Sequence, residues 1–446
     1  MCYHRRNINY QAASVRKICS HHFRPAGGTL WLALLALTLA AQSNAQVATV
    51  LHSFTGALYD GAKPIAGVAI GSAGVLYGAT FDGGSGIACG AAGCGTIYSL
   101  TPPSSPGGLW TEAVLYSFLG GGIDGENPAA TLIMNSAGVL YGTTYAGGTS
   151  SGGTVFSLTP PTTPGAPWTE AVLYNFIPGN KNGAFPAAGL AIDTNGVLYG
   201  TTLFGGNSSV GVVFSLTPPA VAGMHWTQAV VVNLSNLKTG SLPMASLALA
   251  DNHTIYGTTG SGGAAGYGTA FLLKQAPSGG AWRPTLLHSF GGPTVDGATP
   301  ESNLAIGTGG VLYGTTYSGG TFGKGTVYSL TPPAVGSTSW TESVLYNFTG
   351  GSDGGEPRAG VLLTSTGTLY GTTYDGGSAG SGAVYFLTPP ATTGAPWTEA
   401  VTYSFPGGSG GGNSRSGLVM DATGLLYGTT YSGGLFSLGT VFSLLP

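Results

Sequence analysis

The chain has 446 residues, of which 80 are glycine and 27 are proline, while only 7% are charged and 10% are aromatic. Disordered chains are rich in charge and poor in aromatic residues, so this composition excludes a largely disordered protein. Because glycine and proline interrupt helices and favour tight turns, it also excludes a helical bundle and indicates an all-β fold.

Residues 1–45 have the features of a signal peptide. Five basic residues precede an apolar run at 30–41, and Ser43-Asn44-Ala45 then forms a small-x-small cleavage site. The run has 12 residues, whereas a membrane-spanning helix takes about 20. We therefore expect cleavage and export, to the periplasm or the medium, with no membrane span in the mature chain. An uncleaved anchor is the alternative.

The mature chain is acidic. All 16 acidic residues and eight of the 13 basic ones lie after residue 45, which gives a net charge of −8. The basic residues form no cluster, so nucleic acid is not an expected partner, because phosphate binding needs a basic surface. We expect a monomer without a cofactor.

From residue 46 on, the chain consists of seven repeats. The tetrapeptide Tyr-Gly-(Thr/Ala)-Thr begins at seven tyrosines spaced 57 to 64 residues apart, namely Tyr77, Tyr141, Tyr199, Tyr256, Tyr313, Tyr370 and Tyr427. Each repeat holds four short segments rich in Val, Tyr, Thr and Phe, such as 301–307, 310–317, 325–333 and 340–348. Four antiparallel strands repeated seven times predict an all-β, seven-bladed β-propeller that forms one domain over residues 46–446.

The two ends of the repeat array predict how the ring closes. The last repeat stops after 439–446 (GTVFSLLP) and lacks an outer strand, whereas residues 47–54 (VATVLHSF) supply a spare one. We expect this N-terminal strand to complete the last blade, because that removes two exposed sheet edges. The innermost segments carry small residues, such as Ala66-Gly67 and Ser416-Gly417, which fits strands that converge on a narrow channel.

The first repeat contains an insertion with the two cysteines of the mature chain, Cys89 and Cys94. Metal binding would need further ligands, and no histidine lies nearby in the sequence. In an exported chain the pair predicts a local disulfide, with free or metal-bound thiols as the alternatives.

The repeats resemble the GloVer tandem repeat of secreted bacterial proteins, built on Gly-x-Leu-Tyr-Gly-Thr-Thr-x-x-Gly-Gly followed by Gly-Thr-Val-Phe/Tyr-Ser-Leu. Residues 138–148 (GVLYGTTYAGG), 310–320 (GVLYGTTYSGG) and 368–377 (TLYGTTYDGG) carry the match. The Gly-Gly pair and the tryptophan that opens the fourth strand are also loosely similar to kelch propellers. The resemblance implies an exported repeat protein of unassigned activity and supplies no catalytic residues. Because this chain ends within a strand, we expect no C-terminal anchor.

The mature histidines are predicted to be structural. They are His52, His225, His253 and His288, and two of them, His52 and His288, fill a slot that holds tyrosine in other repeats. Metal cages and Ser-His-Asp triads need histidine beside its partners, so we expect neither. Two Gly-x-Ser-x-Gly matches, at 148–152 and 407–411, lack the strand-to-helix turn of a nucleophile elbow.

Asp-Gly recurs between the last strand of one blade and the first strand of the next, at 60–61, 124–125, 296–297 and 353–354. A ring of Ca²⁺ ligands is one interpretation, but one aspartate per loop is sparse for an ion that takes about six to eight oxygens. We favour turn formation. The six mature tryptophans each open a fourth strand, which predicts packing between blades: Trp110, Trp168, Trp226, Trp282, Trp340 and Trp397.

The aromatic residue after Thr-Thr is a candidate for ligand contact. It enters a glycine-rich loop that, in propellers, shares a face with the Asp-Gly loop. The candidate ligand-binding residues of this face are Tyr145, Tyr317, Tyr374, Tyr431, Asp353, Glu356, Arg358 and Arg415. Rings for stacking and polar groups for hydroxyls suit a sugar. Packing of each tyrosine on its own blade is the alternative.

Two classes of function remain open. The first is a non-catalytic binding or adhesion propeller that recognises a polysaccharide or another extracellular protein. The second is an enzyme that cleaves glycans with two carboxylates about 5–10 Å apart, for which Asp353 and Glu356 are the close pair. The equivalent acids Asp124 and Glu126 make that pair look like repeat consensus, so binding without catalysis is favoured.

Arg358 and Arg415 are equivalent residues of adjacent repeats, each at the start of an inner strand. We expect them to stand together at the channel mouth, where forked donors suit a carboxylated sugar or an acidic side chain. The alternative is that each arginine neutralises a nearby acid such as Glu356, in a surface pair of little energetic value.

Overall fold

The structure is a computed structural model that describes residues 46–446 except 57, 106, 164, 222 and 393. The predicted signal peptide, residues 1–45, lies outside this part of the chain. Within the described residues, no helix is long and apolar enough to cross a membrane.

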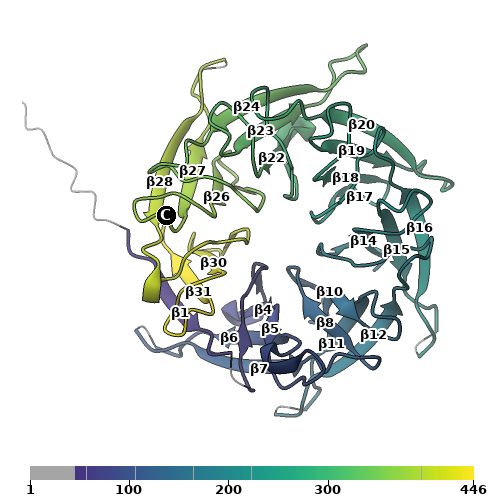
Figure 1. Ribbon diagram of the computed structural model, residues 1–446, viewed down its shortest axis with the longest axis vertical. Coiled ribbons are helices and arrows are strands. Elements are labelled where there is room, and N and C mark those ends of the chain that lie inside the picture. Colours follow the sequence, from purple (N-terminus) through teal and green to yellow (C-terminus); the bar gives the residue numbers. More distant parts are fainter. Residues whose placement is uncertain (1–45, 57, 106, 164, 222, 393) are drawn as a thin grey trace, which may run out of the picture. The chain divides into compact units, whose positions relative to one another are not determined.

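Seven antiparallel sheets surround a central channel, which confirms the predicted seven-bladed propeller (Figure 1). Blade 1 consists of β3 (Ala69–Ile70), β4 (Leu76–Thr80), β6 (Thr96–Thr101) and β7 (Thr111–Ser117). Blade 2 consists of β9 (Ile133–Met134), β10 (Leu140–Gly147), β11 (Thr154–Thr159) and β12 (Thr169–Asn175). Blade 3 consists of β13 (Ala191–Ile192), β14 (Leu198–Thr202), β15 (Val212–Thr217) and β16 (Thr227–Asn233). Blade 4 consists of β17 (Ala248–Asp251), β18 (Thr254–Thr259), β19 (Thr269–Lys274) and β20 (Arg283–Ser289).

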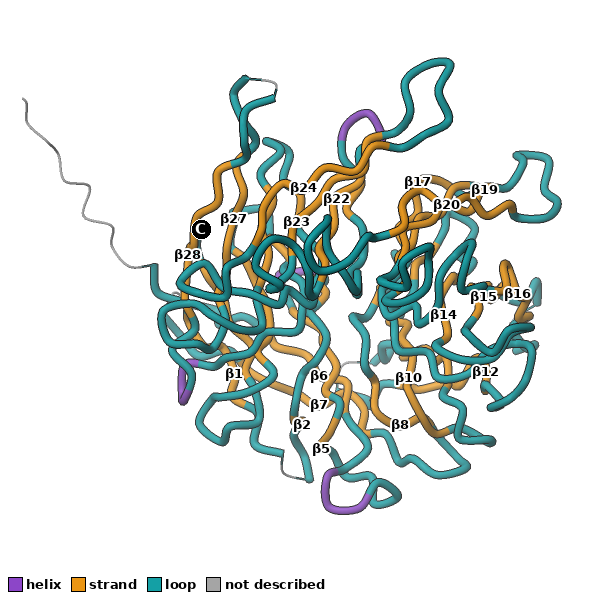
Figure 2. The backbone as a smooth tube through the Cα atoms, turned by 45° about the horizontal axis from the view of Figure 1, so that its top comes forward, coloured by secondary structure: helices purple, strands orange, loops and turns teal. Residues whose placement is uncertain are grey.

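Blade 5 consists of β21 (Ala305–Ile306), β22 (Leu312–Thr316), β23 (Thr326–Thr331) and β24 (Thr341–Asn347). Blade 6 consists of β25 (Leu362–Leu363), β26 (Leu369–Thr372), β27 (Ala383–Thr388) and β28 (Thr398–Ser404). Blade 7 is β29 (Val419–Met420), β30 (Leu426–Thr430), β31 (Thr440–Leu444) and β1 (Thr49–Ser53). In addition, β8 (Gly125–Pro128) pairs with β10, and β2 (Gly61–Ala62) pairs with β5 (Asp82–Gly83). Four 3-10 turns lie in loops: Ser72–Gly74, Gly90–Ala92, Thr308–Gly310 and Gly408–Gly410. Figure 2 shows how much of each blade consists of the loops between these short strands.

The N-terminal strand closes the ring, as predicted. β1 pairs antiparallel with β31, with Thr49 opposite Ser443 and Ser53 opposite Thr440. Phe54, which follows β1, is fully buried against Tyr98 of blade 1, with ring centroids 5.1 Å apart. The first and last segments of the propeller therefore share one sheet, and Figure 1 shows β1 beside β31.

The apolar core lies between blades. Seven clusters of buried side chains each combine residues from two adjacent blades, including the joint between blades 7 and 1. The predicted tryptophan packing is confirmed: each indole makes an edge contact with the Tyr-Gly-Thr-Thr tyrosine of the preceding blade, as Trp168 does with Tyr77 at 5.9 Å between ring centroids. Because each blade buries its apolar face only against its neighbours, the stability of every blade depends on the completed ring.

The Tyr-Gly-Thr-Thr motif serves the contacts within and between blades. A Cβ atom on Gly142 would lie 2.6 Å from the Phe156 ring, so the second strand needs glycine there. The hydroxyl of the first threonine donates to a backbone carbonyl of the next blade, as Thr429 does to Ala66 at 2.9 Å across the ring closure. The second threonine is fully buried and bonds to the first threonine of the third strand, as in Thr144–Thr154 at 2.8 Å between the hydroxyl oxygens.

The innermost strands are shorter than the sequence predicts. The expected segment 301–307 contains the two-residue strand β21, and Ser302 precedes it at the channel wall. The Ser302 carbonyl accepts a hydrogen bond from Thr258 of the preceding blade at 2.9 Å, and its hydroxyl accepts one from the Thr315 amide at 3.1 Å. These hydrogen bonds replace the backbone hydrogen bonds of a regular β-ladder. They fix the backbone beside the channel, although this segment is not a strand.

The predicted disulfide is present in the insertion of blade 1. Cys89 and Cys94 are joined, with Cα atoms 5.2 Å apart. Cys94 is fully buried in the core between blades 1 and 2. The bridge therefore ties an exposed loop to the interior of the propeller.

Candidate functional site: the channel mouth

The central channel is too narrow for a ligand along most of its length. Its cavity volume, counted as the space open to water, is about 120 Å³, and up to three consecutive residues from each of the seven blades line it. The predicted small residues stand here, among them Ala66-Gly67, Ala188-Gly189 and Ser416-Gly417. Such a space accommodates a few waters, so the opening of the channel is where a ligand would bind.

A wider cavity of about 340 Å³ opens at one end of the channel. Its wall contains one equivalent residue from every blade, a set that we call the mouth residues: Ile65, Ala129, Ala187, Met244, Glu301, Arg358 and Arg415. Phe81, Tyr145 and Leu203, which follow the second threonine in blades 1 to 3, complete the wall. Blades 1 to 4 thus contribute apolar side chains, and blades 5 to 7 contribute one acid and two arginines.

A repeated backbone conformation sets the position of each mouth residue. In every blade, the residue two positions before the mouth residue is not glycine and has a positive φ angle. This angle is 57° for Glu356 and 55° for Asn413. In six of the seven blades the amide of this residue donates to a loop of the preceding blade, as Glu356 does to the Lys324 carbonyl at 2.7 Å. This conformation costs about 1–3 kcal/mol for a residue with a side chain. The contact with the neighbouring blade holds it in place and aims the mouth residue at the channel axis.

The two arginines alternate with three tyrosines, in a group that we call the Arg–Tyr arc: Tyr317, Arg358, Tyr374, Arg415 and Tyr431. The Arg358 guanidinium carbon lies 4.3 Å from the Tyr317 ring centroid and 4.8 Å from that of Tyr374. The Arg415 guanidinium carbon lies 5.3 Å from the Tyr374 centroid and 4.0 Å from that of Tyr431. Cation–π contacts of this kind are worth about 0.5–2 kcal/mol each. They hold both guanidinium groups at the cavity wall without using their N–H donors.

The charges at the mouth are unequal. An Arg358 terminal nitrogen lies 3.6 Å from a Glu301 carboxylate oxygen, and among the described residues Arg415 forms no ion pair. The Nε atoms of Arg358 and Arg415 are both buried without a hydrogen-bond partner in the described chain. Burial raises the pKa of Glu301, and the two arginines oppose that shift. Three charged side chains therefore leave a net positive charge at the mouth of an acidic protein.

The candidate residues other than Arg358, Arg415 and Tyr145 lie outside the cavity wall. Glu356 accepts hydrogen bonds from Lys324 and from the Tyr317 hydroxyl, both at 3.0 Å, so it pairs with lysine and does not neutralise an arginine. Asp353 accepts from the Thr349 amide at 2.8 Å and from the Tyr346 hydroxyl at 3.0 Å, and so stabilises its turn. Neither carboxylate lines the mouth cavity. Of the four candidate tyrosines, Tyr145 lines the cavity, whereas the other three brace the arginines.

The two sets of loops meet on one face, as expected. The Lys324 ammonium bridges Glu356 and Asp375, which belong to different loops, with the Asp375 oxygen at 3.3 Å. Isolated bridges pair each blade-to-blade loop with the loop after the second strand, such as Gly355 with Asp375 and Gly412 with Ser432.

The sequence-based list of candidates omits Glu301 and Met244 from the mouth. The signal was available, because subtracting one 57-residue repeat from Arg358 gives Glu301, and a second subtraction gives Met244. Phe81 and Leu203 occupy the same repeat position as Tyr145. A search for polar and aromatic types gives little weight to aliphatic residues, although apolar side chains form most of the wall.

The Asp-Gly residues have the turn role that the sequence favours. Asp124 accepts bonds from the Leu119 and Gly125 amides at 3.0 and 2.6 Å, and from the Tyr116 hydroxyl at 2.8 Å. His288 and His52 replace that tyrosine in two blades and contact Asp296 and Asp60 through Nε2, at 2.7 and 3.3 Å. Each of these joints also holds a glutamate from the next blade. Burial raises the pKa of Glu112, Glu170, Glu342 and Glu399 to about 7.

The fold and this mouth define a repeat-built, seven-bladed β-propeller with a polarised channel opening. The sequence matches the Gloeobacter/Verrucomicrobia repeat over residues 37–271 and 220–442, and the chain belongs to that family. No curated protein matches it.

Two solved structures are among those similar to this chain. A fungal alcohol oxidase of the AA5 family, in complex with copper, is similar with a TM-score of 0.52 and 13% identity, over 90% of this chain and 77% of that one. An ancestral GH74 enzyme is similar with a TM-score of 0.44 and 13% identity, over 78% of this chain and 46% of that one. At 13% identity, the likeness to the alcohol oxidase concerns the fold alone.

Proposed function

We propose that this protein is an exported, non-catalytic binding propeller whose channel mouth recognises a carboxylated glycan. The observation that carries the proposal is the pair of arginines, Arg358 and Arg415, which line one cavity and share contacts with the Tyr374 ring. Guanidinium groups bind carboxylates through two parallel hydrogen bonds, which gives direction as well as affinity.

The size and polarity of the cavity favour an acidic sugar over a larger partner. A volume of about 340 Å³ is small for a protein interface, but it accommodates one sugar residue. A sugar acid carries a carboxylate on one edge and an apolar C–H face. The first suits blades 5 to 7, and the second suits the apolar wall of Ile65, Phe81 and Met244.

Catalysis on the glycan has no comparable support. A glycosidase needs two carboxylates that face the same bond, whereas Asp353 and Glu356 each bond within their own loops and lie outside the cavity wall. Glu301 is the acid at the mouth, and it faces arginine. Export is supported by the leader features in the sequence and by the Cys89–Cys94 bridge, since disulfides persist in oxidising compartments.

A glycan array on the mature protein tests the proposal first, because it compares uronate-containing glycans with neutral ones. Calorimetry with tetragalacturonate as the probe then compares the wild type with the double variant Arg358→Ala/Arg415→Ala. We expect the double variant to bind at least about tenfold more weakly, a loss of about 1.4 kcal/mol or more, with little change in melting temperature.

Arg283→Ala is the matched control, because Arg283 is exposed on the outer strand β20 and lies outside the mouth. It should bind like the wild type. Equal affinity of the double variant, or a loss that follows unfolding, would place the site elsewhere. Binding of acidic peptides with no response to uronates would make the ligand a protein.

A further inference from the structure

The joints between blades carry a recurring three-residue polar group. It consists of the fourth-strand residue equivalent to Tyr116, the residue in the Asp-Gly position, and the residue two positions after the next blade's tryptophan. At two joints these are Tyr116, Asp124, Glu170 and Tyr346, Asp353, Glu399. At two other joints histidine replaces the tyrosine, giving His288, Asp296, Glu342 and His52, Asp60, Glu112.

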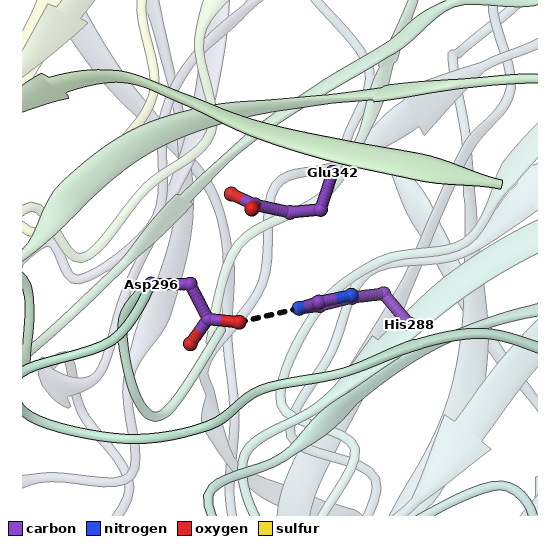
Figure 3. A group of neighbouring side chains, drawn as sticks. All are labelled: His288, Asp296 and Glu342. Carbon is purple, nitrogen blue, oxygen red and sulfur yellow. Dashed lines mark hydrogen bonds and ion pairs between the residues drawn. The ribbon is translucent and has the colours of Figure 1, made fainter.

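The joint between blades 4 and 5 brings potential metal ligands close together. His288 lies on β20, Asp296 in the following turn and Glu342 on β24 (Figure 3). Their ligand atoms all lie within 4.8 Å of one another, and His288 Nε2 is 2.7 Å from an Asp296 oxygen. The sequence does not predict this grouping, because Glu342 belongs to the next repeat.

One oxygen of this group has no partner. Glu342 Oε1 is buried and forms no hydrogen bond within the described chain, and the same holds for the equivalent oxygens of Glu112, Glu170 and Glu399 at the other three joints. The histidine therefore distinguishes this joint from the tyrosine joints. The other Asp296 oxygen accepts the Gly291 amide at 2.7 Å, which fixes the carboxylate with one oxygen toward His288. A buried acceptor without a donor costs about 1–3 kcal/mol, more when it is charged. Two carboxylates that face each other therefore need a cation or a proton.

We propose that His288, Asp296 and Glu342 bind a divalent transition metal ion, with Zn²⁺ as the preferred ion. Zn²⁺ accepts both imidazole nitrogen and carboxylate oxygen as ligands, and with these three protein ligands a water would complete four-coordination. The charge of the ion balances the two carboxylates. Ca²⁺ and Mg²⁺ favour all-oxygen sites, so the imidazole selects against them. The ion would join blade 4 to blade 5 by bonds to both.

The tyrosine joints are natural counterparts without a metal-binding nitrogen. Tyr346 makes the same contact with Asp353 that His288 makes with Asp296, at 3.0 Å against 2.7 Å. His288→Tyr should therefore keep the joint intact. The second histidine joint is looser: His52 Nε2 lies 3.3 Å from an Asp60 oxygen that also accepts the Gly61 amide at 2.6 Å. We assign the metal to the His288 joint alone.

Thermal denaturation of the full-length chain, without a polyhistidine tag and after chelator treatment, tests the proposal at pH 8. Added Zn²⁺ should raise the melting temperature of the wild type and of His52→Tyr by about 2 °C or more, through preferential binding to the folded state. It should leave His288→Tyr unchanged. Equilibrium dialysis should show one Zn²⁺ fewer in His288→Tyr than in the wild type. Comparing variants removes the contribution of the three histidines in residues 1–45.

Three results would overturn the assignment: no zinc-dependent stabilisation of the wild type, equal stabilisation of His288→Tyr, or loss of the effect in His52→Tyr alone. Stabilisation by Ca²⁺ in place of Zn²⁺ would also contradict it. If His288→Tyr fails to fold, His288→Gln and Glu342→Gln provide the same comparison, because both amides keep polar contacts and weaken the ligand set.

Discussion

Arg358 and Arg415 are held at the mouth by aromatic rings more than by acids. Tyr374 is shared between the two guanidinium groups, at 4.8 and 5.3 Å from their carbon atoms. Stacking fixes an arginine plane without using its N–H donors, whereas a carboxylate would occupy them. The tyrosines are therefore positioning residues for the arginines, and only Tyr145 faces the cavity as the sequence-based interpretation expects.

This arrangement predicts distinct effects for two substitutions of Tyr374. Tyr374→Leu removes the shared ring and should weaken uronate binding several-fold, an effect of about 0.5–1.5 kcal/mol, by releasing both arginines. Tyr374→Phe keeps the ring and should bind like the wild type. Calorimetry on both variants checks this. Equal binding by the leucine variant would show that the arginines do not need the ring.

The buried glutamates at the joints make stability depend on pH. Burial raises the pKa of Glu170 from 4.5 to about 7, and the charge of Asp124 adds to the shift. A carboxyl with a raised folded-state pKa binds its proton more tightly in the folded state than in the unfolded state. Its stabilising contribution is thus complete below about pH 4.5 and is lost as the pH rises to about 7.

Replacing that carboxyl tests the sign. Glu170→Gln should raise the melting temperature at pH 8 by on the order of 1–3 °C and change it little at pH 5. Blade 3 already carries glutamine at this position, where Gln228 donates to the Asn182 carbonyl at 3.4 Å. The reciprocal variant Gln228→Glu should add pH dependence. Scanning fluorimetry at both pH values measures this, and destabilisation by Glu170→Gln at pH 8 would refute the sign.

The strand β1 contributes to the stability of the whole propeller because it closes the ring. It supplies the outer strand of blade 7 and the half-buried Leu51, and it leads into the fully buried Phe54 at the joint with blade 1. At about 25 cal/mol per Å² of apolar surface, such a strand is worth several kcal/mol, comparable with the total stability of about 5–15 kcal/mol of a typical domain.

Deleting residues 47–54 should therefore open the ring. We expect the deletion variant to aggregate or to melt far below the wild type, as measured by scanning fluorimetry and size-exclusion chromatography. Thr49→Ala, at an exposed position of β1, is the control for a mild change in the same strand. Wild-type melting in the deletion variant would remove the case for closure by the N-terminus.

The Cys89–Cys94 bridge should matter less than β1. It closes a short loop, with a sequence separation of five, so the entropy that it removes from the unfolded chain is small. Cys89→Ser/Cys94→Ser should lose at most about 2–3 kcal/mol and keep the fold. Chemical denaturation measures the loss. Thiol labelling of the untreated protein should find neither cysteine, and labelling of both would reject the pairing.

At the scale of the whole molecule, the periodic features could be predicted and the positions that break the period were harder to see. Blade number, strand types, closure by β1, tryptophan packing and the disulfide follow from residues that recur or from simple spacing. The pairing of Arg358 with Glu301, and of Glu356 with Lys324, depends on which side chain of the neighbouring blade is within reach. The grouping of His288 with Glu342 spans two repeats for the same reason. A single sequence shows which positions of the seven repeats are equivalent, but it does not show which side chains of neighbouring blades contact each other.

The backbone repeats seven times, but the mouth does not. Blades 1 to 4 present Ile65, Ala129, Ala187 and Met244, and blades 5 to 7 present Glu301, Arg358 and Arg415. The scaffold tolerates alanine at this position, so packing does not require arginine there. A charged half and an apolar half around one cavity give a bound ligand a single orientation, which a symmetric ring would not.

The central claim is that this half-charged mouth binds a carboxylate. Titration calorimetry with tetragalacturonate and with its carboxyl-reduced, neutral counterpart tests it most directly, because the two differ only in that group. The wild type should bind the acidic form at least about tenfold more tightly, a difference of about 1.4 kcal/mol or more, and Arg358→Ala/Arg415→Ala should abolish the difference. Equal affinity of the wild type for the two forms would contradict the claim.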